Sequence, residues 1–235
     1  MASFFTIILD TIAPATTAIK INNGAAYVND ADRLCTVTIT TGDSNTTGYQ
    51  MKIWGDIDTS NNTSIQSTEG TSSWMSYEAE KQIKLSSGDG IKNVYCKLRD
   101  DVGNESSIVS AQTILDTEIH VVTVQSQSVT KISAVEGYNT VTFSFFVSDT
   151  NPAVDSFTEY KVCCVSASSV PADEATAIGI TNGSVNMSAT GTFKYDEPIS
   201  CTIKTADLVA TAAGAGDGSK IIKVYAKSAD GVWSN

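Results

Sequence analysis

The single histidine is the side chain best suited to proton transfer at neutral pH, so it is the first candidate for chemistry. An imidazole titrates near neutrality and serves hydrolases as a general base beside a nucleophilic Ser or Cys. His120 has no Ser-based, Cys-based or acidic motif around it, and it follows a predicted domain boundary. We therefore expect His120 to be a surface or boundary residue and not a catalytic one.

Pairs of acidic residues are the second candidate, because two carboxylates that face one glycosidic bond can cleave it. Four pairs are adjacent or nearly so in the sequence: Asp56/Asp58, Asp100/Asp101, Asp173/Glu174 and Asp196/Glu197. Neighbouring acids on strands or turns usually diverge into solvent instead of converging on a substrate. We therefore predict that the chain is not an enzyme and has no catalytic residues.

Acidic turns can also bind calcium through carboxylate and carbonyl oxygens. The run from Asp56 through Asp58 to Asn61 begins like a calcium-binding loop, but it lacks the glycine at its sixth position and the distal glutamate. Ligands elsewhere would come from the unit starts and the turn that precedes a unit, namely Asp10, Asp116, Asp100 and Asp101. We expect solvated acidic loops, no metal site and no cofactor, with calcium as the one ion left open.

The five cysteines do not form a metal site, because they include no Cys-x-x-Cys pair and have no histidine partners. Cys35 and Cys96 each alternate in phase with aliphatic residues, so both are expected in one core. A disulfide between these facing positions stays open, although a reducing cytoplasm favours buried thiols. Cys163 and Cys164 are adjacent and must face opposite sides of a strand, so we expect one buried and the other less so.

Composition places these residues in a β-rich protein without a surface for nucleic acid. The chain has 235 residues, of which 41% are hydrophobic and 17% charged, and its formal net charge is -11. Abundant Ser and Thr with little Pro disfavour both helical bundles and disorder. Acidic charge is spread over both halves, so neither half offers phosphates a basic face. The length suits one large or two small domains.

The chain shows no recognisable targeting or membrane segment. Its N-terminal stretch is apolar, but no Lys or Arg precedes Lys20 and the apolar run ends at Asp10, whereas a secretory signal needs a basic start and a longer apolar stretch. No stretch approaches the roughly 18 apolar residues of a membrane helix. We expect a protein made in the cytoplasm, without a signal peptide and without membrane contact.

An internal repeat is the strongest signal in the sequence. Residues 88–106 align without a gap on residues 216–234, and the glycines, an aspartate, a lysine and the final serine coincide. The alternation of apolar and polar residues coincides too, which predicts the same half-exposed strand in both copies. Residues 101–104 read Asp-Val-Gly-Asn where 229–232 read Ala-Asp-Gly-Val, so we expect the last turn of the second copy to be built differently.

A second match locates the boundary between two domains. Residues 8–11 and 114–117 both read Ile-Leu-Asp-Thr, so we divide the chain into 1–115, a sandwich with an N-terminal strand or arm, and 116–235, a second and longer one. Short strands at this spacing indicate a two-sheet β-sandwich in each domain. The predicted elements are strands at 34–40, 50–54, 81–85, 91–99, 120–125, 140–148, 159–166, 199–204 and 221–227, and a short helix at 207–213 capped by Thr205.

Aromatic side chains are the remaining candidates for ligand contact, because exposed rings can stack on sugars or form a docking surface. The candidates are Trp54, Trp74, Tyr77, Tyr95, Tyr225 and Trp233. Trp54 lies in a predicted strand in phase with aliphatic neighbours, so we expect it in the core. Trp74 lies in a long loop, which makes it the better candidate for exposure.

The first domain resembles a class of immunoglobulin-like repeats that occur in virion structural proteins of tailed bacteriophages and in bacterial surface proteins. The motifs that carry the resemblance are Leu-Asp-Thr-Ile-Ala-Pro at 9–14, Gln-Met-Lys-Ile-Trp at 50–54, the spacing of Trp74, Tyr77 and Lys81, and the stretch 85–106. The second domain keeps mainly 216–234 and the Asp-Thr at 116–117. The resemblance implies an all-β chain of two tandem immunoglobulin-like β-sandwiches, and it implies function only loosely because such sandwiches host many tasks.

The segment 4–9 occupies the place of a preceding unit's last residues and is β-prone, so we expect it to pair with a neighbouring copy or another particle protein by strand addition. With the resemblance, this suggests a non-enzymatic virion structural or accessory protein on the particle surface, either an auxiliary capsid decoration or a tail or fibre component. Its partners would be other virion proteins of the capsid or tail lattice. The alternative is an adhesin-like module that binds bacterial surface glycan through an exposed aromatic patch with Trp74 and Tyr225.

Overall fold

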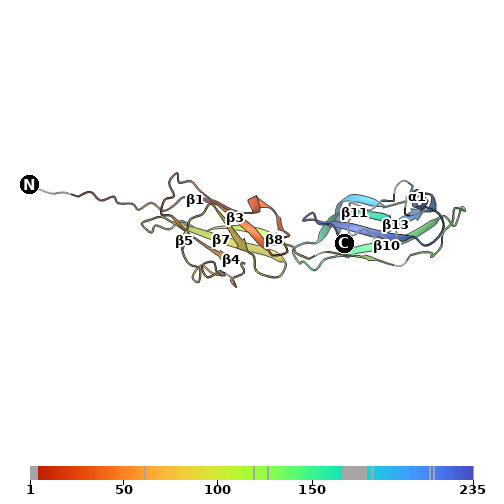
Figure 1. Ribbon diagram of the computed structural model, residues 1–235, viewed down its shortest axis with the longest axis horizontal. Helices are drawn as coiled ribbons and strands as arrows, with labels where there is room; N and C mark the ends of the chain where they lie inside the picture. The colour runs from red at the N-terminus through yellow and green to blue at the C-terminus, as the bar shows by residue number, and fades with distance from the viewer. Residues whose placement is uncertain are drawn as a thin grey trace, which may run out of the picture. The chain divides into compact units, whose positions relative to one another are not determined.

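Two compact units make up the chain, unit 1 at Met1–Thr117 and unit 2 at Glu118–Asn235 (Figure 1). The computed structural model describes residues 5–234 except 61, 119, 126, 166–178, 181, 182, 212 and 214. The sequence predicted a boundary at 115/116, and the chain divides two residues later, between Thr117 and Glu118. Both units are built almost entirely of strands, so the predicted all-β class is confirmed.

Unit 1 is a sandwich of two sheets. One sheet has the strand order β1-β3-β6 and the other has the order β2-β8-β7-β4-β5, with β2 parallel to β8. Some strands that follow each other in sequence, such as β3 and β4, lie in different sheets, as in immunoglobulin-like sandwiches, whereas β7 and β8 pair within one sheet. The strands are β1 (Thr16–Ile21), β2 (Tyr27–Val28), β3 (Leu34–Thr41), β4 (Gln50–Gly55), β5 (Met75–Ser76), β6 (Glu80–Lys84), β7 (Gly90–Arg99) and β8 (Val109–Leu115).

The core of unit 1 lies between its two sheets. Cys35, Val37 and Ile39 alternate inward from β3 and pack with Ile53 of β4 and Cys96 of β7. The intervening residues of these strands face outward, because side chains alternate between the two faces of a strand. Each buried Val or Ile side chain stabilises the fold by about 1.5–3 kcal/mol relative to an exposed position.

Unit 2 is a second two-sheet sandwich with the strand orders β13-β10-β9 and β12-β11-β14. Aromatic rings fill much of its core, where Phe145 meets Tyr160 edge to face at 5.2 Å and Phe157 stacks on Phe193 at 5.2 Å. The elements are β9 (Val121–Val124), β10 (Thr140–Ser148), β11 (Ser156–Val165), β12 (Ser188–Lys194), β13 (Ile199–Lys204), α1 (Thr205–Val209) and β14 (Ile221–Ser228).

The repeated segments near the end of each unit adopt the same geometry. In unit 1 the Ser106 hydroxyl accepts a hydrogen bond from the Leu98 N–H at 2.9 Å, and in unit 2 the Ser234 hydroxyl accepts one from the Ala226 N–H at 3.0 Å. Both serines are buried. The gapless alignment of the two sequences is therefore a structural equivalence as well.

The turn after the repeated strand has the same backbone in both units, which corrects the expectation that the second is built differently. Gly103 and Gly231 have φ angles of 93° and 94°, and their N–H groups bond to the carbonyls of Asp100 and Ser228. The two turns differ in the position of the aspartate that accepts their backbone N–H groups. In unit 1 this is Asp100, at the start of the turn, which accepts two N–H groups. In unit 2 it is Asp230, two residues later in the alignment, which accepts the Val232 N–H.

Every strand predicted from the sequence is present, but the helix is displaced. It was predicted at 207–213 and α1 instead spans Thr205–Val209. Thr205 does not cap it, because its hydroxyl donates to the Ser133 carbonyl at 2.8 Å. No helix in the part of the chain that the structure describes is long and apolar enough to cross a membrane. The strands β1, β2, β5, β8 and β12 were not predicted.

Candidate interaction site

His120 is buried at the start of unit 2, so the expected boundary position is right and the alternative of a surface position is wrong. One ring nitrogen lies 2.7 Å from the Ala226 carbonyl oxygen. A carbonyl oxygen can only accept a hydrogen bond, so it holds the ring in place but cannot take up a proton from the ring as a catalytic carboxylate or water would. His120 therefore ties the start of unit 2 to β14 and lines the groove beside that strand.

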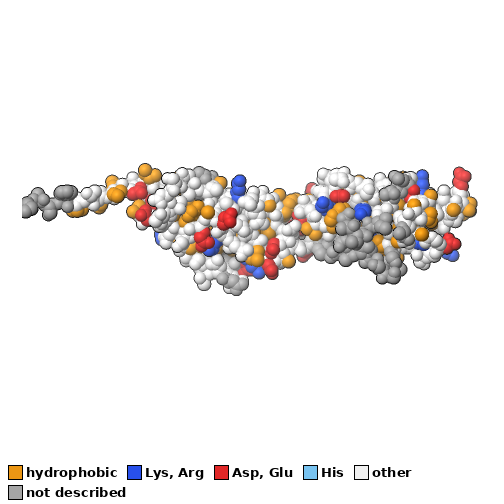
Figure 2. Space-filling view, turned by 45° about the horizontal axis from the view of Figure 1, so that its top comes forward, with side chains coloured by type: hydrophobic (Ala, Val, Ile, Leu, Met, Phe, Trp, Pro, Cys, Tyr) orange, Lys and Arg blue, Asp and Glu red, His pale blue; other side chains and the backbone are white. Residues whose placement is uncertain are grey.

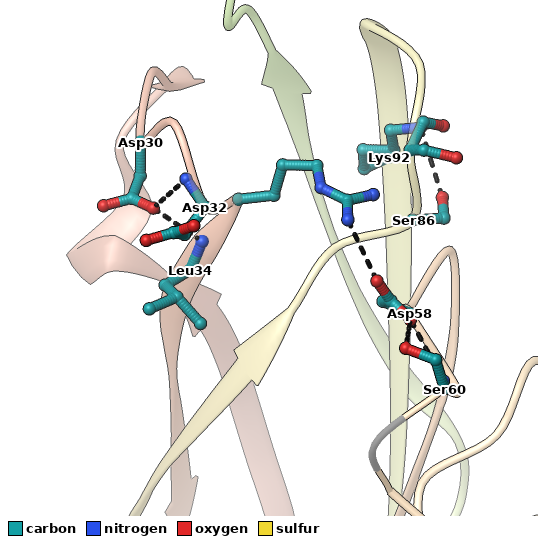
Figure 3. Close-up of polar contacts among 9 residues, drawn as sticks. Asp30, Asp32, Leu34, Asp58, Ser60, Ser86 and Lys92 are labelled. Atoms are coloured by element: carbon teal, nitrogen blue, oxygen red, sulfur yellow. Dashed lines mark hydrogen bonds and ion pairs between the residues drawn. The ribbon is translucent and has the colours of Figure 1, made fainter.

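Asp56 and Asp58 hold separate loops and do not converge. Asp56 accepts the N–H of Asn93 at 2.8 Å. Asp58 pairs with Arg33 at 2.9 Å and accepts hydrogen bonds from the N–H and the hydroxyl of Ser60 (Figure 3). The hydrogen bonds from Ser60, and after them the charge of Arg33, hold the pKa of Asp58 below its usual range.

The carboxylate of Asp100 points into the turn that Asp100 begins and is shielded from solvent. Its Oδ1 accepts the Asn104 N–H at 2.8 Å and the Val102 N–H at 3.1 Å, while its Oδ2 accepts the Asn104 side-chain amide at 2.8 Å. Burial acts to raise the pKa of Asp100, but the bonds from Asn104 and the backbone outweigh it and lower the pKa. Asp101 is exposed. The two carboxylates therefore point to different environments.

The other acidic candidates do not gather into a site either. Asp196 and Glu197 are both exposed, and the pair Asp173/Glu174 lies outside the described residues. Asp10 accepts the N–H of Ile12 at 3.0 Å, so it also holds a local turn. Across the described ranges, no group of three or more His, Cys, Asp or Glu is placed to hold a metal ion. Asn61 of the calcium-like run is outside those ranges.

All five cysteines are buried thiols. Cys35 and Cys96 face one core, as their strand phase predicted, and burial raises the pKa of each thiol to about 12, helped at Cys35 by the charge of Asp30. Cys163 and Cys164 do face opposite sides of β11, but both are buried, which corrects the expectation of one exposed thiol. The reason is a second cluster on the outer face, where Cys163 packs with Val165, Tyr225 and Trp233.

These thiols predict a specific labelling result. In the folded chain, a thiol reagent at pH 8 should label almost no cysteine within minutes, because all five are buried and the thiolate is the reactive form. After unfolding in urea without reductant, all five should react at once. Mass spectrometry counts the labels. Two missing labels, with Cys35 and Cys96 recovered as one bridged peptide, would contradict the prediction.

Trp54 is buried, but not in the core where it was expected. Met51 and Ile53 are the core-facing residues of β4, so Trp54 points to the opposite face of the sheet. There it stacks on Tyr95 of β7 with ring centroids 5.8 Å apart, and its backbone pairs with Gln66 of the following loop. The loop that contains Gln66 covers Trp54, so this side chain is buried although it points away from the core between the two sheets.

The exposed aromatic patch expected around Trp74 and Tyr225 does not form. Tyr225 is fully buried in the outer cluster of unit 2. Trp74 is half-buried in unit 1, where Lys52 Nζ lies 4.8 Å and Arg99 Cζ lies 4.5 Å from its ring centroid. Cations over the ring occupy the surface that a sugar would use. Tyr77 is also half-buried, and its hydroxyl donates to the Ile39 carbonyl at 3.0 Å.

A groove of about 410 Å³ in unit 2 has a partly apolar lining and lies beside a strand edge that no described residue pairs with as a strand. Its walls are the two strands β9 and β14, and β14 is the outer strand of its sheet. Val121 and Val124 of β9 remain 58% and 50% exposed. The lining residues are His120, Val121, Val122, Val124, Ile222, Lys223 and Val224.

The N-terminal arm, residues 5–12, is the second exposed apolar surface. Phe5, Ile7, Ile8 and Leu9 are each at least 80% exposed, and the arm belongs to no strand. Orange hydrophobic side chains are visible along the arm in Figure 2. At its base the Asp10 carbonyl accepts a bond from the Asn104 side chain at 3.3 Å. The sequence identified the arm from its apolar run. It did not identify the groove, which depends on which strand lies at the sheet edge.

Comparison with known proteins adds structural similarity alone. No protein-family model and no curated protein matches the sequence. The fibronectin(III)-like modules of Clostridium thermocellum CbhA are 12% identical over 92% of this chain and 89% of theirs, with a TM-score of 0.40. The D00-D0 domain of intimin is 14% identical over 93% and 96%, with a TM-score of 0.36. Dimeric latent PorU from Porphyromonas gingivalis is 11% identical over 97% and 20%, with a TM-score of 0.28, and similarity at this level supports no argument about function.

Proposed function

We propose that this chain is a non-enzymatic structural or accessory protein exposed on the surface of a tailed bacteriophage particle, as an auxiliary capsid decoration or a tail or fibre component. The observation that carries the proposal is that the side chains best suited to catalysis or metal binding instead make structural contacts or lie buried. His120, Asp58 and Asp100 hold the backbone or a loop, and the five thiols are buried. The motif resemblance supplies the phage setting.

The protein would act through shape and surface. Figure 2 shows acidic and basic side chains scattered over the drawn surface of each sandwich, and the chain has a formal net charge of -11. Many copies on one lattice multiply weak contacts, because each bound contact raises the effective concentration of the next. The partners are other proteins of the capsid or tail lattice, with neither nucleic acid nor membrane among them. The chain is made in the host cytoplasm and ends in the virion.

Quantitative mass spectrometry of purified particles tests this proposal. The expected result is a reproducible number of copies per particle, measured against the major capsid protein as internal standard. A ratio near that of the capsid protein indicates a head decoration or other lattice component. A few copies indicate a fibre, collar or baseplate component. Particles of full infectivity that contain none of this chain would overturn the proposal.

The alternative is an adhesin-like module for bacterial surface glycan, and the observation that keeps it is that the Trp74 side chain stays partly exposed although Lys52 and Arg99 lie over its ring. A glycan array would decide. Binding that is lost in Trp74→Ala and kept in Tyr138→Ala, a substitution at a tyrosine that is 72% exposed, would establish the alternative. The virion proposal expects no glycan signal from either variant or from the unmodified chain.

A further inference from the structure

The last strand of unit 1 has no counterpart among the described residues of unit 2. In unit 1, β8 pairs with β7 from Gly90↔Leu115 to Cys96↔Val109 and extends the sheet beyond β7. The repeat makes β14 the equivalent of β7. Within the described residues, however, β11 is the one strand that pairs with β14.

The open edge of β14 is oriented for an added strand. Backbone N–H and C=O groups alternate in direction along a strand. The Ala226 N–H points away from β11 and bonds to the Ser234 hydroxyl at 3.0 Å. By the alternation of two, the backbone groups of Val224 and Ile222 point to that same side, and both residues line the groove.

The arm carries the pattern of β8. Because 8–11 repeats 114–117, residues 5–9 align with 111–115. Positions 113 and 115 of β8 are buried, while its alternate positions are more exposed. The same alternation puts Phe5, Ile7 and Leu9 on an inward face and leaves Thr6 and Ile8 outward, so the inward face is apolar throughout.

We propose that residues 5–9 of one copy enter the groove between β9 and β14 of a second copy and complete unit 2 as its last strand. Repeated from copy to copy, this joins the chains head to tail. The repeat fixes the register: Phe5 lies opposite Ile222 as Ala111 lies opposite Val94, and Thr6 lies opposite Ile221 as Gln112 lies opposite Asn93. This inference goes beyond the proposed function and holds whether or not the chain belongs to a phage.

Two features of the chain favour a second copy as the occupant. An exposed apolar arm and an exposed sheet edge are each an aggregation hazard that pairing removes. The junction past β8 also has a ready equivalent. In unit 1 Asp89 accepts the N–H and the hydroxyl of Thr117 at 2.9 and 2.8 Å. The corresponding residues are Thr11 of the arm and Asp217 of the acceptor copy, which is exposed.

Solution size is the first test. Light scattering on the purified chain 1–235 should show a mass that rises with concentration through dimers to longer chains, and electron microscopy should show linear particles. A variant without residues 2–9 should be monomeric and keep the melting transitions of both units. A wild-type chain that is monomeric from micromolar to millimolar concentration would overturn the inference, as would undiminished assembly of the deletion variant.

A matched pair of arm substitutions tests the face that enters the groove. Ile7→Asp places a charge on the inward face and should abolish assembly, whereas Ile8→Asp places it outward and should reduce assembly less than about threefold. Both residues are at least 80% exposed in the free arm, so neither substitution affects the fold of its own copy. Equal loss in both variants would indicate non-specific apolar association and overturn strand addition.

Cross-linking tests the register. A Thr6→Cys chain mixed with an Ile221→Cys chain should form a covalent dimer under mild oxidation, because the two positions form a non-hydrogen-bonded pair whose Cα atoms lie close enough for a disulfide. Thr6→Cys with Lys223→Cys, two positions away, should give at least tenfold less. The five native thiols are buried and do not compete. Equal yields, or a closed monomer as the product of a chain that carries Thr6→Cys and Ile221→Cys together at high dilution, would overturn the inference.

Discussion

Gly55→Ala should unfold unit 1, with a loss of more than about 4 kcal/mol in its free energy of unfolding. Gly55 ends β4 at a φ of 132°, and an added Cβ would lie 2.2 Å from the Asn93 carbonyl oxygen on β7. That carbonyl cannot move aside, because it accepts the Asp56 N–H at 2.8 Å. Urea denaturation followed by tryptophan fluorescence measures the change, since Trp54 and Trp74 report on unit 1.

Gly88→Ala is the matched control. Gly88 also has a positive φ, 80°, but nothing lies within 4 Å of the added Cβ. Only the left-handed backbone then opposes the substitution, so the loss should be about 1 kcal/mol. Unit 2, reported by Trp233, should be unchanged in both variants. Equal effects at the two glycines would mean that backbone conformation and not the close approach to β7 makes Gly55 necessary.

The strand repeat and the two cores could be predicted because they depend on local alternation. A residue two positions along a strand returns to the same face, so the phase of Cys35 and Cys96 was enough to place both thiols in one core. The same logic failed for Trp54 and Cys163. Each lies on the face away from its core, and each is buried because a distant segment covers it. Alternation gives the face of a side chain but not what covers that face.

The interaction site was half predictable for a related reason. The sequence itself shows the apolar run at 5–9 and its alignment with 111–115, so the arm could be identified as a β-prone segment in need of a partner. The groove could not, because it exists only where β14 is the outer strand beside β9. Strand order depends on contacts between residues far apart in sequence. The repeat located β14, and only the structure showed that its edge is open in the described residues.

The stability of unit 1 should fall steeply between pH 9 and pH 12. Burial raises the pKa of Cys35 and Cys96 from 9.0 to about 12 in the folded chain. In the unfolded chain both thiols ionise near pH 9, so over this range the unfolded state binds fewer protons than the folded state. Releasing these protons lowers the free energy of the unfolded state and so destabilises the fold. The contribution of the two protonated thiols to the free energy of unfolding is complete below pH 9. It is lost as the pH rises toward 12, at about 1.4 kcal/mol per pH unit for each thiol. Tyr77 and Lys97 act in the same direction, since burial raises the pKa of Tyr77 and the Glu105 hydrogen bond raises that of Lys97.

Urea titrations at a series of pH values, with reductant present, measure this slope for each unit. The double variant Cys35→Ala/Cys96→Ala is the control, because alanine keeps both positions apolar and removes both titrations. Its unit 1 should lose stability with pH at a rate lower by about 3 kcal/mol per pH unit between pH 9.5 and 11. Unit 2, where burial raises the pKa of Cys201 to about 12, should keep its own slope in both proteins. If the variant and the original chain lost stability in parallel, the two thiols would have to ionise in the folded core, which their position between the two sheets opposes.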